Sequence, residues 1–250
     1  MTKPFASEYP LLRAKERIIA ALDVPRAEEA REIVSELRGE VGAFKVGSQL
    51  FTAAGPELVR EFTDLGLKIF LDLKFHDIPN TVANATIEAA RLGVWMLNVH
   101  TLGGSEMIKR TVDEVRLACE RERIVRPFVI GVTILTSSTR SALEEIGIER
   151  DLEEEVVKLA KLAADCGLDG VVASPQEIVT LRETVPNRDF LIVTPGIRPQ
   201  FGTKDDQKRV RTFAEAIRDG ADFAVIGRPI IQAKDRLEAV KQIIGETETK

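Results

Sequence analysis

Eight short apolar runs alternate with eight longer amphipathic segments along the chain, and this order limits the folds it can adopt. The apolar runs, rich in Val, Ile, Leu and Phe, are typical of buried strands. We expect strands at residues 17–24, 43–48, 68–75, 94–102, 126–137, 170–174, 190–197 and 223–230. The segments that follow them are typical of helices, which we expect at 26–41, 55–66, 79–93, 105–122, 152–167, 175–185, 212–220 and 235–244.

Strands that are separated by helices run parallel, because a tight hairpin joins only antiparallel neighbours. Eight strand–helix units in 250 residues favour an α/β fold of the closed (β/α)8 type over an open doubly wound sheet. No G-x-G-x-x-G motif follows the first strand, which also argues against a dinucleotide-binding fold. Since no linker divides the chain, we expect a single barrel domain over residues 1–250, with an N-terminal extension at 1–15.

The composition of the chain limits the classes of partner that such a domain can bind. The net charge is −5 and no block of Lys and Arg occurs, so we expect no nucleic-acid partner. No apolar run approaches the roughly 18 residues of a membrane-spanning helix, so we expect no membrane partner. Cys119 and Cys166 lie in helical segments without disulfide or zinc spacing. With no apolar leader at the N-terminus, these features predict a cytoplasmic protein.

The third predicted strand ends in charged residues, within the sequence FLDLKFHDIPNTV at 70–82. Side chains alternate between the two faces of a strand. Ile69 and Leu71 therefore face the helices together with Leu73 and Phe75, whereas the opposite face carries Phe70, Asp72 and Lys74. Active sites of (β/α)8 barrels lie at the carboxyl ends of the strands, so this position indicates function.

Other strands end in the same way. Asp23 ends the first strand, Lys45 faces inward on the second, and Thr136 ends the fifth. We expect Asp23, Lys45, Asp72 and Lys74 to converge at one mouth of the barrel, from three consecutive strands. The alternative is an ion-pair cluster with a purely structural role. Buried ion pairs rarely stabilise a protein more than apolar packing does, so we favour a functional site.

Asp77 differs from these four because it lies in the loop after the strand, three residues beyond Lys74 and about 10 Å away at full extension. It either folds over its own barrel mouth or reaches a neighbouring one, and the sequence does not choose between them. His76 and His100 lie close by in the sequence. Histidines at strand ends are more typical of structural hydrogen-bonding groups than of catalysts.

A phosphate site is expected at the last two strands, because the loops after strands seven and eight commonly bind phosphate in this fold. Gly227 and Arg228 lie at the end of the eighth expected strand and offer a backbone N–H and a guanidinium. Arg198 ends the seventh strand. Gln207 lies in the long connection 198–211, which we expect to close over the same anion. A second long connection covers residues 138–151.

The sequence DLKFHDIPNT at 72–81 matches the D-x-K-x-x-D-I-x-N-T motif of the orotidine 5′-monophosphate decarboxylase family, which nearly the whole chain resembles. Further matches occur in the expected order: ALD at 21–23, FKVG at 44–47, VTILTS at 132–137, TPGIR at 194–198, DDQKR at 205–209 and IGR at 226–228. The resemblance implies a homodimer without cofactors. It also implies the conversion of orotidine 5′-monophosphate (OMP) to uridine 5′-monophosphate (UMP) and CO2, the last step of de novo pyrimidine synthesis.

The resemblance also implies a role for each residue of the motif. Lys74 is implied as the proton donor to C6 of the pyrimidine, and Asp72 as the neighbour of the reacting carboxylate. Asp77 is implied to come from the partner subunit, with Ile78 and Thr81 beside it.

On the substrate side, the resemblance implies that Asp23 and Lys45 contact the ribose and extend the charge network. Thr136 is implied to contact the pyrimidine. The implied phosphate side consists of Arg198, Gln207, Gly227 and Arg228.

The chemistry suits these residue types. Loss of CO2 from C6 leaves an electron pair in the plane of the ring, where the ring carbonyls cannot delocalise it. A fixed ammonium stabilises this carbanion and then donates a proton to it. Charges that alternate in sign and are set in advance need no reorganisation during the reaction.

Two other functions remain possible. A Mg2+-dependent sugar-phosphate decarboxylase or aldolase, such as 3-keto-gulonate phosphate decarboxylase or hexulose phosphate synthase, shares the D-x-K-x-x-D pattern. Such enzymes bind the metal through oxygen ligands, helped by an acidic residue on the second strand, where this chain has Lys45. The other possibility is a non-catalytic nucleotide-binding barrel, which has no need of Lys74.

Overall fold

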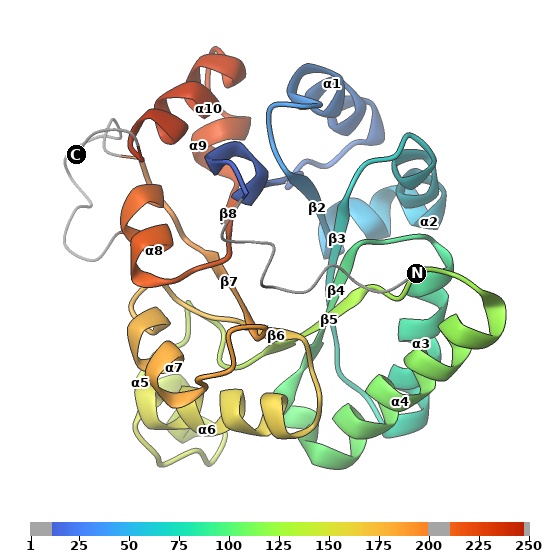
Figure 1. Cartoon of the computed structure of the whole chain (residues 1–250), viewed down its shortest axis with the longest axis vertical. Helices are drawn as coiled ribbons and strands as arrows, with labels where there is room; N and C mark the ends of the chain where they lie inside the picture. The colour runs from blue at the N-terminus through green and yellow to red at the C-terminus, as the bar shows by residue number, and fades with distance from the viewer. Residues whose placement is uncertain (1–11, 200–210, 248–250) are drawn as a thin grey trace.

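The computed structural model describes residues 12–199 and 211–247, and within them eight parallel strands close into a barrel in sequence order (Figure 1). The (β/α)8 barrel predicted from the alternation is therefore confirmed. The strands are β1 (Ile18–Ala21), β2 (Ala43–Gly47), β3 (Ile69–Phe75), β4 (Met96–His100), β5 (Phe128–Val132), β6 (Gly170–Val172), β7 (Leu191–Pro195) and β8 (Phe223–Ile226).

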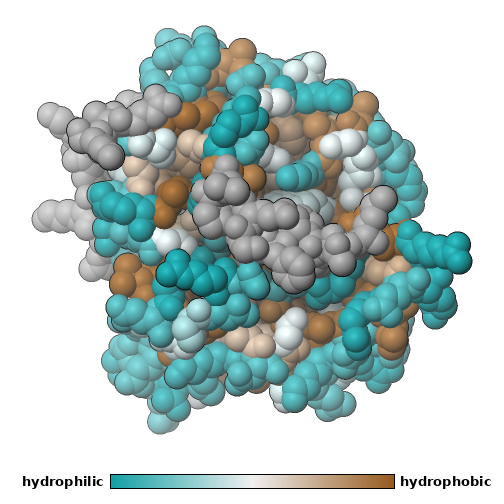
Figure 2. Space-filling view, viewed as in Figure 1, coloured by the Kyte–Doolittle hydropathy of each residue, from teal (hydrophilic) through white to brown (hydrophobic). Residues whose placement is uncertain are grey.

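Helices surround the barrel, and the eight predicted ones are all found. They are α1 (Ala27–Leu37), α2 (Ser48–Asp64), α3 (Pro79–Arg91), α4 (Gly104–Glu122), α6 (Leu152–Asp165), α7 (Ile178–Thr184), α8 (Phe213–Asp219) and α10 (Arg236–Gly245). On the face seen in Figure 2 their outer surfaces are mostly hydrophilic, as expected of amphipathic helices around a core. Within the described ranges, no helix has the length and apolar character needed to cross a membrane.

The described residues also contain short helical segments that the sequence pattern did not predict. They are η2 (Ala14–Arg17), η3 (Thr101–Gly103), α5 (Arg140–Glu145) and α9 (Arg228–Ile231). The connection 138–151, expected as a long loop, thus holds α5, whose first turn is capped by the side chain of Thr139. Helical segments of three to six residues are too short to show an apolar periodicity.

Helix α2 begins earlier than its predicted start at residue 55. It runs from Ser48 across a kink at Gly55, whose φ of 71° lies in the left-handed region. Pro56 follows and begins the second part of the helix, because a proline lacks the N–H that a helix interior requires. The glycine and proline therefore mark a kink within a longer helix.

The core has two layers, and the strands separate them. One cluster fills the barrel interior and consists of Ile19, Ala21, Ala43, Phe70, Met96, Phe128, Ile130, Leu191, Val193, Phe223 and Val225. The other lies between strands and helices and includes Phe44, Val46, Ile69 and Leu71. The faces predicted for the second and third strands are thus correct, and positions 45 and 72 face the interior.

Strand β3 is irregular near its carboxyl end. Leu71 pairs with Leu97 of β4, but the next pair joins Phe75 to Val99, so β3 contains a bulge. Within it Lys74 has a φ of 52°, a left-handed conformation that is unfavourable for a residue with a side chain. The sequence predicted a regular strand here, and this detail was wrong.

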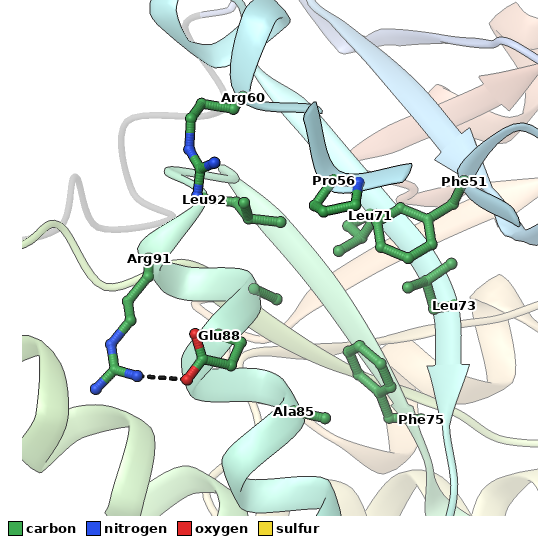
Figure 3. Close-up of a pocket in the computed structure, with 11 residues that line it drawn as sticks. Phe51, Pro56, Arg60, Leu71, Leu73, Phe75, Ala85, Glu88, Arg91 and Leu92 are labelled. Atoms are coloured by element: carbon green, nitrogen blue, oxygen red, sulfur yellow. Dashed lines mark hydrogen bonds and ion pairs between the residues drawn. The ribbon is translucent and has the colours of Figure 1, made fainter. Parts of the chain in front are cut away.

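Helix α3 packs along α4, and a groove of about 370 Å3 remains between α2 and α3 (Figure 3). Leu71, Leu73 and Phe75, the outward-facing residues of β3, line this groove together with Phe51 and other mostly apolar side chains. None of the candidate site residues lines it. The charged face of β3 points the other way, into the barrel.

Candidate active site

Four charged side chains meet at the carboxyl ends of β1, β2 and β3. The ammonium of Lys45 lies 2.9 Å from Asp23 Oδ1 and 3.2 Å from Asp72 Oδ2. On the other side of Asp72, Lys74 Nζ lies 2.7 Å from Oδ1. The structure thus brings together the four residues that were expected to converge. We call this arrangement, in the order Asp23, Lys45, Asp72 and Lys74, the charge array.

The two inner members of the charge array are buried and the two outer ones are accessible. The side chains of Lys45 and Asp72 are 10% and 14% exposed, whereas those of Lys74 and Asp23 are 38% and 59% exposed. Burial opposes the charge of Lys45, but the carboxylates of Asp72 and Asp23 outweigh it and raise its pKa. Burial likewise opposes the charge of Asp72, but Lys45 and Lys74 keep its pKa below the usual range. Both inner groups are therefore charged at neutral pH.

Two glycines border the charge array. A Cβ atom at Gly47 would lie 3.0 Å from Lys45 Nζ and 3.4 Å from Asp23 Oδ1, so the glycine leaves room for this ion pair. The Cβ position of Gly227, at the end of β8, lies 3.6 Å from Asp23 Oδ2. The predicted phosphate side is therefore adjacent to the first member of the array.

Asn98 contacts the charge array, and the sequence reasoning did not identify it. It is fully buried on β4, on the inward face that also carries Met96. Its Nδ2 donates a hydrogen bond to Asp72 Oδ1 at 2.7 Å, and its Oδ1 accepts one from the backbone N–H of Lys74 at 2.8 Å. The available signal was an amide inside an otherwise apolar strand, two positions before a histidine.

The two histidines lie beside the end of β3. The rings of His76 and His100 are stacked, with their centroids 5.4 Å apart. Burial, together with the smaller effects of the nearby His76 and Lys74, lowers the pKa of His100 to about 4. His100 is therefore a neutral imidazole at physiological pH, close to the charge array without adding to its charge.

Asp77 and Ile78, in the loop after β3, and Thr81, in the first turn of α3, are all exposed. Asp77 Oδ1 accepts a hydrogen bond from the backbone N–H of Ile78 at 2.6 Å. Among the residues that the structure describes, Asp77 has no ion pair with Lys74 or Lys45. A single chain thus assembles four members of the expected charge network and leaves Asp77 outside it.

The predicted substrate-binding residues near the other strands face solvent. Thr136 is exposed in the connection between β5 and α5, and Arg228 is exposed at the start of α9. Arg198 is exposed, and its backbone N–H donates to the carbonyl of Arg211 at 3.3 Å, so the two ends of the 198–211 connection are adjacent. Gln207 lies outside the described residues.

Within the described ranges, no three His, Cys, Asp or Glu side chains are grouped so as to hold a metal ion. The charge array instead combines an accessible ammonium with a buried carboxylate beside it. Such a pair can stabilise and protonate a developing negative charge.

Sequence similarity to known proteins shows the family to which this chain belongs. Residues 16–243 match the sequence model of the orotidine 5'-phosphate decarboxylase / HUMPS family. The chain is 52% identical over 236 residues to an orotidine 5'-phosphate decarboxylase of Syntrophotalea carbinolica, covering 94% of this chain and 96% of that protein. It is 53% identical over 234 residues to that of Geobacter sulfurreducens, covering 94% and 97% of the two chains.

A solved structure gives the same result for the fold. The crystal structure of orotidine 5'-phosphate decarboxylase from Lactobacillus acidophilus superposes with a TM-score of 0.80 at 40% identity, over 93% of this chain and 99% of that one. The family match over residues 16–243 includes the strands that carry the charge array. The chain therefore belongs to the orotidine 5'-phosphate decarboxylase / HUMPS family.

Proposed function

We propose that this protein converts OMP to UMP and CO2 without a metal or an organic cofactor. Its relatives at about half identity are named orotidine 5'-phosphate decarboxylase, which supports this substrate. One observation carries the proposal. The partly exposed ammonium of Lys74 lies 2.7 Å from the buried carboxylate of Asp72, at the end of strands where barrel enzymes act.

The proposed reaction breaks the bond between C6 and its carboxylate, and CO2 leaves without the bonding electrons. The electron pair stays on C6, where the ammonium of Lys74 stabilises it and then donates a proton to form the C6–H bond. Lys74 is left as a neutral amine and regains its proton from water. Asp72 and Lys45 are fixed in advance, so little reorganisation accompanies the change in charge.

The rest of the substrate is bound by residues around this centre. We assign Asp23 and Lys45 to the ribose and Thr136 to the pyrimidine, following the family motifs. The phosphate contacts are assigned to Arg198, Gln207, Gly227 and Arg228. The short distance between Gly227 and Asp23 supports a ribose and a phosphate bound side by side. Binding energy from the remote phosphate can also favour closure of the 198–211 connection.

We assign the loop at the start of α3 to a neighbouring subunit's site, in a homodimer. Asp77, Ile78 and Thr81 would then complete the partner's charge array and substrate pocket. Two observations support this arrangement: Asp77 stays outside its own array, and the apolar side chain of Ile78 is 66% exposed. An exposed apolar residue beside a functional loop is typical of an interface.

The Mg2+-dependent function left open by the sequence is less compatible with this site. It needs oxygen ligands where Lys45 stands, and the Lys45 ammonium instead contacts both Asp23 and Asp72. A cation at that point would repel a metal ion.

The direct test is the loss of ultraviolet absorbance when OMP is added to the purified protein, in buffer with excess EDTA. We expect complete conversion to UMP at an unchanged rate with and without EDTA. An unchanged spectrum would refute the decarboxylase and favour a binding protein. Activity that EDTA abolishes and Mg2+ restores would refute the cofactor-free mechanism.

A further inference from the structure

Asn98 occupies a position that joins the backbone and the side chain of the proposed proton donor. Its Oδ1 accepts the backbone N–H of Lys74 at 2.8 Å, and its Nδ2 donates to Asp72 Oδ1 at 2.7 Å. The same Asp72 oxygen accepts a hydrogen bond from Lys74 Nζ at 2.7 Å. Lys74, Asn98 and Asp72 therefore form a closed ring of hydrogen bonds.

The bulge in β3 explains why a side chain is needed at this point. Between Leu71 and Phe75 the regular pairing with β4 is lost, so the ladder gives the backbone N–H of Lys74 no partner. Lys74 also has a φ of 52°, which a lysine rarely adopts unless its surroundings hold it there. The Oδ1 of Asn98 replaces the missing strand carbonyl and holds this conformation.

Only an amide of this size performs both tasks. The Lys74 amide requires an acceptor and the Asp72 carboxylate requires a donor, which fixes the orientation of the Asn98 side chain. A leucine of similar volume would leave a buried N–H unpaired and remove one of the bonds that fixes Asp72. Asn98 is fully buried and has no access to substrate, so any effect on the reaction must pass through its two neighbours.

We propose that Asn98 is a positioning residue for the reaction, which sets the Lys74 ammonium against the reacting carbon by fixing the Lys74 backbone and the Asp72 carboxylate together. This inference rests on the proposed function of Lys74. A misplacement of about 1 Å can lower a rate about a hundredfold even when binding is intact.

The test compares kcat for OMP with the dissociation constant of UMP in Asn98→Leu. We expect kcat to fall about a hundredfold, while UMP binding changes by less than about threefold, because the phosphate and ribose contacts remain. Asn98→Ser provides a small hydroxyl that can replace only one of the two hydrogen bonds at a time, so its kcat should fall less than that of Asn98→Leu. This second variant serves as the test if Asn98→Leu does not fold.

The matched control is Thr101→Val, which removes a buried hydrogen bond from Thr101 Oγ1 to the carbonyl of Val132 at 2.8 Å. The side chain of Thr101 lies beside Gly131 and has no hydrogen bond to a member of the charge array. It should lower the melting temperature and leave kcat per folded molecule unchanged. If both Asn98 variants behave like this control, with normal kcat once folded, the residue is merely structural and the inference is wrong.

The outcome for Lys74→Ala separates this inference from the proposed function. If Lys74→Ala is inactive while both Asn98 variants keep the wild-type kcat, only the role of Asn98 is refuted. If the wild type does not consume OMP, or if Lys74→Ala turns over normally, the proposed function fails and the inference falls with it.

Discussion

Replacing Lys45 by methionine tests whether the opposite charges of the charge array stabilise one another in the folded protein. Methionine keeps an unbranched side chain but removes the ammonium that lies between Asp23 and Asp72. Asp23 is 59% exposed, so losing its ion pair with Lys45 costs at most about 1 kcal/mol. Asp72 is only 14% exposed, and stranding a buried charge costs about 3–5 kcal/mol. Since Lys74 and Asn98 still contact Asp72, we expect the lower end, about 3 kcal/mol in the free energy of unfolding.

The stability difference between Lys45→Met and the wild type should depend on pH. The partners of Asp72 hold its pKa below the usual range in the folded wild type, so the stability that it contributes is present above about pH 4 and is lost as pH falls through the folded pKa. In Lys45→Met that pKa rises, and protonation relieves the uncompensated carboxylate. The difference from the wild type should therefore be largest at pH 7 and shrink towards pH 4. The double variant Lys45→Met/Asp72→Asn should recover about 2 kcal/mol at pH 7.

The assay is urea unfolding at a fixed protein concentration, followed by the fluorescence of Trp95. This single tryptophan packs edge-on against Phe128 and Phe223, among the apolar side chains of the barrel interior. With a slope of about 3 kcal/mol per molar urea, the single variant should unfold about 1 M earlier than the wild type. The reasoning is refuted if Lys45→Met matches the wild type at pH 7, or if the double variant is no more stable than the single one.

Two further predictions concern a buried carboxyl group and the subunit interface. Burial raises the pKa of Glu177 to about 7, so the folded state keeps this proton between about pH 4.5 and 7 while the unfolded state releases it, and stability falls as pH rises. Between pH 5 and 8 the free energy of unfolding of Glu177→Gln, measured by urea titration, should decrease by about 2 kcal/mol less than that of the wild type. If the two proteins show the same pH dependence, Glu177 does not cause the decrease. For the interface, inactive Lys74→Ala and Asp77→Ala subunits, mixed in equal amounts and allowed to exchange, should regain about a quarter of wild-type activity, since half the dimers then carry one intact site. No recovery after verified exchange would contradict a shared site.

Local periodicity was enough to predict the barrel and the direction of its side chains. The alternation of Ile69 and Leu71 with Phe70 and Asp72 follows from the pleat of any strand, and the structure places these residues in the two core layers as expected. The same rule placed Lys45 in the barrel beside Asp23 and Asp72. Charges on the inward face of three consecutive strands must meet, because parallel strands end at the same side of the barrel.

One feature that the sequence did not predict depends on a partner that is distant along the chain. The left-handed backbone of Lys74 is held by Asn98 on the next strand, and no local pattern around Lys74 indicates this contact. The early start of α2 at Ser48 was missed because Gly55 and Pro56 resemble a helix boundary. The proposed place of Asp77 in a partner's site involves a second chain, which the sequence of one chain does not describe.

The central claim is that the ammonium of Lys74, held by Asp72, carries the reaction. The most direct measurement is the kcat of Lys74→Ala on OMP, together with the dissociation constant of UMP for the same variant. Removing a general acid that also stabilises the carbanion should lower kcat by at least about ten-thousandfold, while UMP binding changes by less than about threefold. A Lys74→Ala protein that turns over within about tenfold of the wild type would contradict this account.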